Sequence, residues 1–561
     1  MNYKKLIAEK VQIEGFTADD IQGFIEIPPD SSVGDYALPC FRFSKALRKS
    51  PVMIANDLAN AISCDGIIRE VKAVNGYLNF FLDRKAVAKT TLDSVLELGS
   101  RFGADTEGED KTICIDYSSI NIAKPFHIGH LSTTVIGGAL YRIYKFLGYN
   151  VVGINHLGDY GTQFGKLIYA YKNWGNREDV GKGGIKELTR LYVDYHTKSE
   201  ENPALDDEAR RYFKLIEEGD SECVELFNWF KEMTLREVKK IYDILDIHFD
   251  SYAGESFYND KMQVVIDELQ EKGLLVESQG AKIVDLSEYN MPPCIILRSD
   301  GASLYATRDI AAAVYRKNTY DFYKCLYVVA YQQDLHFKQI FKTLELMGKP
   351  WAKDMVHVSY GMVSLEDGAM STRHGKVVLL EDVINVCIEK ARSVIEDKNP
   401  DLENKEVIAR QIGTGAVVFG ALQNNKIKDI VFSYDKVLSF EGETGPYVQY
   451  TVARCNSVMA KADIEFAGYE IEDICDSEYA LCVALGAFPD IVKSSAEKYE
   501  PSFVTRYAID LAKAFNRFYL DCKVLTAVGN TKKFRLALVE STRTVLKNAL
   551  ALLGISSPER M

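Results

Sequence analysis

The chain has 561 residues, of which 47% are hydrophobic and 26% charged, and its formal net charge at pH 7 is −13. This length is too great for a single hydrophobic core, so we expect about three or four domains. The composition is that of an ordinary soluble globular protein, and the absence of about 18 consecutive apolar residues excludes a membrane-spanning helix.

The N-terminus and the cysteine pattern both bear on where the protein works. Residues 1–5 are not followed by a long apolar run, which argues against a signal peptide and predicts a cytoplasmic protein. The eleven cysteines are scattered from Cys40 to Cys522 without a C-x-x-C pair. This pattern is typical of buried thiols in a reducing compartment, and it predicts neither a disulfide framework nor a structural zinc site.

Residues 1–105 predict a small α/β domain. Residues 37–62 have helical spacing interrupted at Pro51, and residues 74–81 alternate like a strand after a glycine turn. A stretch rich in Gly, Asp and Glu, residues 102–110, indicates a linker to the next domain.

The next segment predicts a strand, a helix and a second strand. Residues 112–117 form a short apolar run, and apolar residues then recur at helical spacing from Val135 to Leu147. Gly148 is expected to end this helix, and Val151 to begin the next strand. Such a βαβ unit implies a parallel sheet.

The remainder predicts an insertion and a helical C-terminal region. Residues 175–250 are charged with a helical period, and strand-like runs return at residues 294–297, 326–330 and 355–360. After about residue 384 the pattern is mainly helical. We therefore expect a Rossmann-type α/β domain with a helical insertion, between a small N-terminal α/β domain and an all-α C-terminal domain.

The most informative motif, residues 121–130, lies between a predicted strand and the start of a helix. Backbone N–H groups and the helix dipole favour a phosphate there. His127 and His130 share a face, so both can donate hydrogen bonds to an α-phosphate under attack. Gly129 lets a flat adenine approach the backbone, and Lys124 adds positive charge. The motif alone is weak, since the alternative is a pair of histidines that cap a helix.

His127-Ile128-Gly129-His130 resembles the signature of class I aminoacyl-tRNA synthetases, and residues 121–125 resemble the version in arginyl-tRNA synthetases. The resemblance continues, in the family's order, through residues 153–165, 304–309, 333–337, 445–450 and 558–561. It implies an added tRNA-contacting domain at 1–105, a catalytic domain at 106–383 with its insertion at about 175–250, a connecting helical stem at 384–436 and a helical anticodon-binding domain at 437–561.

The resemblance implies an arginine–tRNA ligase whose partners are L-arginine, ATP and tRNA(Arg). The arginine carboxylate attacks the α-phosphorus of ATP, and the terminal adenosine of the tRNA then attacks the acyl carbon. The protein would contribute position and charge neutralisation, with Mg²⁺ accompanying the nucleotide. The family is usually monomeric.

Residues 368–376 resemble the second class I signature, a mobile loop with a Met-Ser core. Ala369 and Thr372 stand where lysines are usual, and the resemblance implies that Lys124 compensates. The cationic charge on the leaving pyrophosphate is therefore expected from Lys124 and two residues of this loop. The predicted catalytic residues are Lys124, His127, His130, Arg373 and Lys376, and the predicted ATP contacts are His127, Gly129, His130, Met370 and Ser371.

Arginine is distinguished from lysine by its planar fork of N–H donors, which a carboxylate can accept in parallel. Tyr305 and Asp309 are four residues apart on a predicted helix, and the resemblance implies that they hold the guanidinium; the alternative is an exposed Tyr–Asp pair. His336 is a further candidate, or else a buried hydrogen-bonded histidine. The predicted arginine-binding set is Asp116, which replaces a frequent Glu, with Asn121, His156, Tyr305, Asp309 and Gln333.

The C-terminal region carries the predicted tRNA surface. Unpaired bases stack on Tyr and Arg planes, and the resemblance implies that such planes line the anticodon site. Acidic residues predominate at 461–500 and basic residues at 501–561, which suggests a phosphate-binding face or an ordinary solvated helix face. The predicted tRNA contacts are Tyr447, Tyr450, Arg454 and Tyr519.

Two alternatives stay open. A cysteinyl-tRNA synthetase has a similar C-terminal domain but would need Cys and His zinc ligands, which are not spaced for that here. An inactive paralogue that only binds RNA is favoured by Ala369 alone, and opposed by Lys124, Tyr305 and Asp309 with the two motif histidines.

Overall fold

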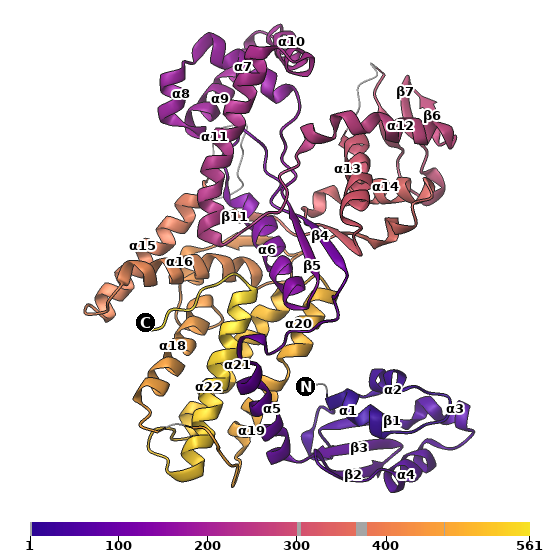
Figure 1. The fold of residues 1–561 in the computed structure, drawn as a ribbon, viewed down its shortest axis with the longest axis vertical. Coiled ribbons are helices and arrows are strands. Elements are labelled where there is room, and N and C mark those ends of the chain that lie inside the picture. The colour runs from indigo at the N-terminus through magenta and orange to yellow at the C-terminus, as the bar shows by residue number, and fades with distance from the viewer. Residues whose placement is uncertain (1–2, 300–304, 366–377, 465) are drawn as a thin grey trace.

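The computed structural model describes residues 3–299, 305–365, 378–464 and 466–561 (Figure 1). At the N-terminus, four helices pack on an antiparallel sheet of order β1-β3-β2. Residues 36–39 form β1 and pair with β3, although the sequence pattern predicted a helix from residue 37. The elements are α1 (Tyr3–Lys10), α2 (Ala18–Phe24), β1 (Tyr36–Pro39), α3 (Ser44–Leu47), α4 (Pro51–Ala61), β2 (Ile68–Val74) and β3 (Tyr77–Leu82).

Helix α5 (Arg84–Leu98) leaves this unit and packs against α19 and α22 at the other end of the chain. Asp83 caps it by accepting a hydrogen bond from the Ala86 N–H at 2.8 Å. Val87 belongs to the core of the N-terminal unit, whereas Leu92 and Val95 belong to the large core shared with the C-terminal helices. The boundary between the two cores therefore falls inside α5.

A four-stranded parallel sheet of order β10-β9-β4-β5 forms the centre. Its strands are short and buried, and Ile113 and Ile115 of β4 face one core while Cys114 faces the other. Crossover helices lead from β4 to β5 and from β9 to β10, so the strand order reverses between β4 and β9. In such sheets, ligands bind outside the carboxyl ends of the strands at this point. The elements are β4 (Thr112–Asp116), α6 (Leu131–Phe146), β5 (Asn150–Ile154), β9 (Lys324–Tyr327), α14 (Asp334–Leu346) and β10 (Met355–His357).

The expected insertion is helical, and Figure 1 shows it as a lobe above the sheet. A second lobe carries an antiparallel sheet of order β6-β7-β8, which contains the strand-like run at residues 294–297. The elements are α7 (Thr162–Trp174), α8 (Arg177–Gly183), α9 (Ile185–Glu201), α10 (Leu205–Glu218), α11 (Ser221–Leu245), α12 (Met262–Glu271), β6 (Leu275–Ser278), β7 (Ala281–Val284), β8 (Cys294–Leu297) and α13 (Tyr305–Tyr320).

The C-terminal region is helical apart from a short parallel pair, β11 and β12. None of the helices in the described ranges is both long enough and apolar enough to cross a bilayer. The elements are β11 (Val363–Leu365), α15 (Leu380–Lys398), α16 (Lys405–Leu422), β12 (Ile430–Phe432), α17 (Tyr434–Val437), α18 (Gly445–Lys461), α19 (Asp476–Gly486), α20 (Phe488–Glu497), α21 (Ser502–Asp521) and α22 (Gly529–Leu552). The predicted fold class is confirmed.

Candidate active site

His127 and His130 open α6 through a single 3₁₀ turn, Ile128–His130. The His127 Nδ1 accepts a hydrogen bond from the Gly129 N–H at 3.1 Å, and the His130 Nδ1 accepts one from the His127 N–H at 3.2 Å. The two ring centroids are 4.0 Å apart, and Phe126 stacks on His130 at 5.0 Å. The two histidines therefore cap the start of the helix, which is the alternative role considered for this motif. Each histidine uses one ring nitrogen to do so.

Both imidazoles are neutral near pH 7. Burial, with the nearby positive charge of Lys124, lowers the pKa of His127. Burial lowers the pKa of His130 to about 3. A neutral ring whose Nδ1 accepts a hydrogen bond must carry its proton on Nε2. Each ring thus keeps one N–H donor of the kind that a phosphate oxygen can accept.

The start of α6 is attached to the edge of the sheet where β4 and β9 end. Thr133, in the first turn of α6, accepts a hydrogen bond from the Ser118 N–H at 2.9 Å and donates one to the Val328 carbonyl at 2.8 Å. Ser118 follows β4 and Val328 follows β9, at the reversal of strand order. The histidine motif therefore lies at the edge where this fold class binds its ligands.

The same motif pairs with the residues that precede α15. The Ile128 N–H donates to the Val378 carbonyl at 3.1 Å, and the Leu380 N–H donates to the Phe126 carbonyl at 3.0 Å. Residues 366–377 are outside the described ranges. The predicted site residues Met370, Ser371, Arg373 and Lys376 lie among them, so their placement stays a prediction.

Lys124 lies on a backbone that the helical insertion supports. Its neighbour Ala123 has a left-handed φ of 60°, which is strained for a residue with a Cβ. The Ala123 N–H donates to the Thr234 hydroxyl of α11 at 3.0 Å. Lys124 lines a cavity of about 1300 Å³ between this loop and helices α8, α9 and α11, and its ammonium lies 5.9 Å from the Tyr192 ring centroid.

Asp309, on α13, is the centre of a chain of polar contacts. His336 Nε2 lies 2.7 Å from Asp309 Oδ2, and His156 Nε2 lies 3.8 Å from Oδ1. His156 Nδ1 is 3.4 Å from Arg316 Nη2, which donates to Asp116 Oδ2 at 2.7 Å. Three residues predicted from distant parts of the sequence, Asp116, His156 and Asp309, are therefore brought together at the carboxyl edge of the sheet.

The electrostatics of this cluster favour a cation. Burial by itself would raise the pKa of Asp309, but the hydrogen bond to His336 and the neighbouring His156 lower it overall. Burial lowers the pKa of His156. An ionised carboxylate thus stands beside a neutral imidazole at pH 7, and its negative charge is available to a bound guanidinium.

Two residues of this cluster were not predicted from the sequence. Arg316 is 1% exposed and holds Asp116, which also accepts a hydrogen bond from the Ser119 hydroxyl at 2.6 Å. Glu255 lies 3.7 Å from Arg308, and burial raises its pKa to about 7. Arg316 is seven residues after Asp309 on α13, a spacing of two helical turns. The sequence spacing could therefore have placed it on the same helix face as Asp309.

The other predicted arginine contacts lie on the segments around this edge. Tyr305 is the first residue of α13, one turn before Asp309, and is 62% exposed. Asn121 follows β4, and its amide oxygen occupies the space that a Cβ at Gly158 would fill. Gln333 is exposed in the 3₁₀ turn before α14, the helix that carries His336.

The four predicted tRNA contacts gather on one surface of α18 and α21. The Arg454 guanidinium lies 4.9 Å from the Tyr450 ring centroid and 5.6 Å from that of Tyr519. Arg454 also donates to Asn516, which donates to the Tyr447 hydroxyl at 2.8 Å. Tyr450 is 40% exposed and Tyr519 37% exposed, so both rings are accessible to a stacking base.

The basic C-terminal segment is less available to phosphates than its charge suggests. Lys532 is buried and paired with Asp463, and Arg535 donates to Glu478 at 2.7 Å. The side chains of Arg543 and Lys547 are also paired, with Glu540 and Glu559. These four cations are therefore paired with acidic residues of the same domain.

Comparisons with known proteins identify the family and agree with the fold. Sequence models of three families match: "Arginyl tRNA synthetase N terminal domain" over residues 1–82, "tRNA synthetases class I (R), catalytic domain" over residues 91–434, and "DALR anticodon binding domain" over residues 448–561. The chain is 51% identical to the arginine–tRNA ligase of Alkaliphilus metalliredigens and 52% identical to one from Clostridium botulinum, covering 100% of each chain. It is similar to the solved Thermus thermophilus arginyl-tRNA synthetase, with 27% identity, a TM-score of 0.83 and 96% of each chain covered.

Proposed function

The chain belongs to the arginyl-tRNA synthetase family, and from that premise we propose that the carboxyl edge of its parallel sheet is where L-arginine is activated. Its reaction is that of an arginine–tRNA ligase, which uses ATP. The observation that carries the site assignment is the contact chain Asp309–His156–Arg316–Asp116, which begins at the end of β4, where Thr133 of α6 is also attached through Ser118. An anionic cluster and a pair of neutral N–H donors at one edge suit a cationic amino acid and a nucleotide phosphate.

Asp309 is proposed to accept two N–H groups of the substrate guanidinium. His336 holds one carboxylate oxygen at 2.7 Å, and His156 Nε2 lies 3.8 Å from the other, so the carboxylate is oriented before the substrate arrives. Tyr305 lies one turn away and supplies a ring or hydroxyl. Lysine carries a single ammonium and cannot make the parallel pair of hydrogen bonds, which accounts for selection against it.

The activation step is proposed to depend on His127, His130 and Lys124. The two Nε2–H groups donate to oxygens of the α-phosphate as the arginine carboxylate attacks in line, and pyrophosphate leaves. Neutral donors lose no proton to the phosphate, so they stabilise charge without acid–base exchange. Lys124 is proposed to neutralise charge on the leaving group, with Arg373 and Lys376 as partners.

Mg²⁺ is proposed to arrive with ATP, bound by its phosphate oxygens, whose charge it would screen. Asp116 and Asp159 do not fit a dedicated cage for the ion, because Asp116 is paired with Arg316 at 2.7 Å and Asp159 is buried beside Lys231 at 2.6 Å. No step is assigned to an ion held by these side chains.

The remaining assignments concern tRNA(Arg) and the state of the protein. Tyr447, Tyr450, Arg454 and Tyr519 are proposed to receive unpaired anticodon-loop bases, and the N-terminal unit to contact another part of the tRNA. We also propose that the protein works as a monomer in the cytoplasm. Sedimentation of the purified protein tests its oligomeric state.

Replacing Lys124 tests the nucleotide side. In Lys124→Gln, we expect arginine-dependent pyrophosphate–ATP exchange, measured with tRNA present, to slow by roughly 10- to 100-fold, since one charge-assisted contact to the leaving group is lost. Lys182 lines the same cavity, and its side chain pairs with Glu178 at 2.7 Å. Lys182→Gln is therefore the matched control. Equal rates in Lys124→Gln and the control would remove Lys124 from the mechanism.

A further inference from the structure

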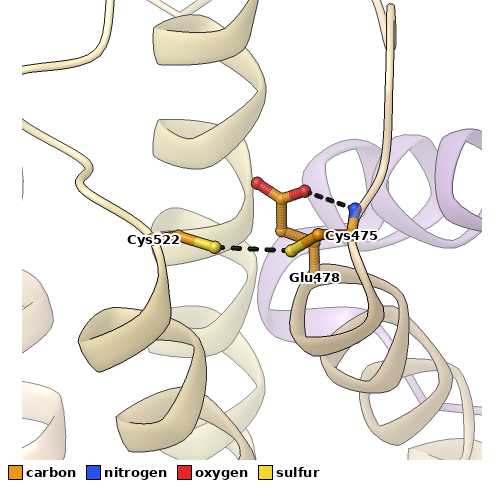
Figure 2. A group of neighbouring side chains, drawn as sticks. All are labelled: Cys475, Glu478 and Cys522. Atoms are coloured by element: carbon orange, nitrogen blue, oxygen red, sulfur yellow. Dashed lines mark hydrogen bonds between the residues drawn. The ribbon is translucent and has the colours of Figure 1, made fainter.

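Two thiols meet in the C-terminal helical domain, far from the active site in sequence. The Cys475 and Cys522 sulfurs are 3.5 Å apart, as Figure 2 shows. Cys475 caps the N-terminus of α19, and Cys522 follows the last residue of α21. The contact joins the beginning of one helix to the end of another.

The nearby carboxylate does not complete a metal site. Glu478 lies close enough to be counted with the two sulfurs as a trio of ligands. One of its oxygens accepts the Cys475 N–H at 2.9 Å and the other accepts the Arg535 Nε–H at 2.7 Å. In Figure 2 the carboxylate turns toward the Cys475 backbone, while the two sulfurs point at each other. The pairing of the sulfurs is therefore direct.

The two thiols differ in access to reagents. Cys475 is exposed, whereas Cys522 is 4% exposed, and burial raises the pKa of Cys522 to about 11. All eleven cysteines lie in the described ranges, and Cys64 is the one other exposed thiol. An external reagent is thus expected to meet Cys475 first, with Cys522 behind it as the second thiol.

We propose that Cys475 and Cys522 are an oxidation site that low-molecular-weight disulfides convert to an internal disulfide bond. The Cys475 thiolate attacks one sulfur of R–S–S–R and releases R–S⁻. Cys522 loses its proton, attacks the Cys475 sulfur of the mixed disulfide and releases the second R–S⁻. The two released thiolates take up the two protons, so two cysteines are oxidised as one disulfide is reduced to two thiols.

The bond would fasten a junction between domains. Asp476, next to Cys475, accepts a hydrogen bond from Arg84 of α5 at 2.7 Å, and the Glu472 carbonyl accepts one from Lys85 at 2.5 Å. Tyr519, on the proposed anticodon surface, is one turn before Cys522 on α21. Oxidation would therefore fix the end of the helix that carries Tyr519 to the helix that abuts α5.

The test uses the full-length protein in the Cys64→Ser background, where the other exposed thiol is absent. The reduced protein is freed of reductant, incubated with glutathione disulfide, denatured and alkylated. We expect the intact mass to show two fewer alkylated cysteines, without a glutathione adduct, and peptide mapping to find residues 475 and 522 joined. The oxidised protein should also melt several degrees higher, because the link closes a long loop.

Cys475→Ser, at the exposed position, is the second variant. In it, Cys522 should stay reduced and the melting temperature should not respond to glutathione disulfide. Two results would overturn the proposal. One is a Cys475–glutathione adduct that persists while Cys522 remains alkylated. The other is one equivalent of zinc retained by the reduced protein and lost in Cys475→Ser, which would make the pair a metal site instead.

Discussion

The proposed arginine pocket is tested most directly by the substitution Asp309→Asn. The amide keeps the size of the carboxylate but removes its charge and replaces one acceptor with a donor. The Asp309 side chain is 26% exposed, and its contact with His336 shows that it is held in place. Each charge-assisted hydrogen bond to the guanidinium contributes about 1.5–3 kcal/mol. Two such bonds give about 3–6 kcal/mol, or a loss of roughly 10²–10⁴ in kcat/KM for arginine.

The assay is arginine-dependent pyrophosphate–ATP exchange with tRNA present, over a range of arginine concentrations. Asp321→Asn is the matched control, since Asp321 immediately follows α13, is 91% exposed and pairs with Lys317. We expect that control to remain within about twofold of wild type. If Asp309→Asn keeps more than a fifth of the wild-type kcat/KM for arginine, with an unchanged melting temperature, the guanidinium is not bound there.

Three further outcomes follow from the geometry. Because the pKa of Glu255 is about 7 and its ionised form favours a cation nearby, KM for arginine should fall as pH rises from 6 to 8, and Glu255→Gln should abolish that trend; a trend that persists in the variant refutes this role. His130, with a pKa of about 3 when folded and about 6.5 when unfolded, binds fewer protons in the folded state between these values. Stability should therefore decline as pH falls through that window, by up to about 1.4 kcal/mol per pH unit, and denaturant titrations of His130→Asn should show a shallower decline. Tyr450→Ala should raise KM for tRNA by roughly 10- to 100-fold and leave KM for arginine unchanged, and an arginine effect without a tRNA effect would contradict the surface assignment.

The parts of the fold that were predicted correctly are those with strong local signals. The strand predicted at residues 112–117 is present as β4, Thr112–Asp116. The helix predicted from the apolar spacing between Val135 and Leu147 is present as α6, Leu131–Phe146. Residues 37–39 were misassigned to a helix, because so short a segment cannot distinguish a strand pattern from a helical one. Its pairing with β3 decides the conformation, and that partner lies some forty residues away.

The candidate site shows the same division. The histidine motif and Asp309 could be found from spacing and resemblance, since each lies within one short segment. Glu255 lies in an irregular 3₁₀ segment and meets Arg308 only through the tertiary fold, so no local pattern marks it. Likewise, the basic C-terminal segment gave no sign that Lys532 is buried against Asp463, because charge counts do not reveal partners.

The division of α5 between two cores decides where the protein can be shortened. A chain that begins after residue 82 keeps the whole helix, including Leu92 and Val95 against α19 and α22. A chain that begins after residue 105 loses α5, which covers α19 and α22. It also loses the carbonyls of Gly99 and Phe102, which accept hydrogen bonds from Asn548. The N-terminal domain can therefore be removed without exposing the core of the C-terminal helices only if α5 is retained.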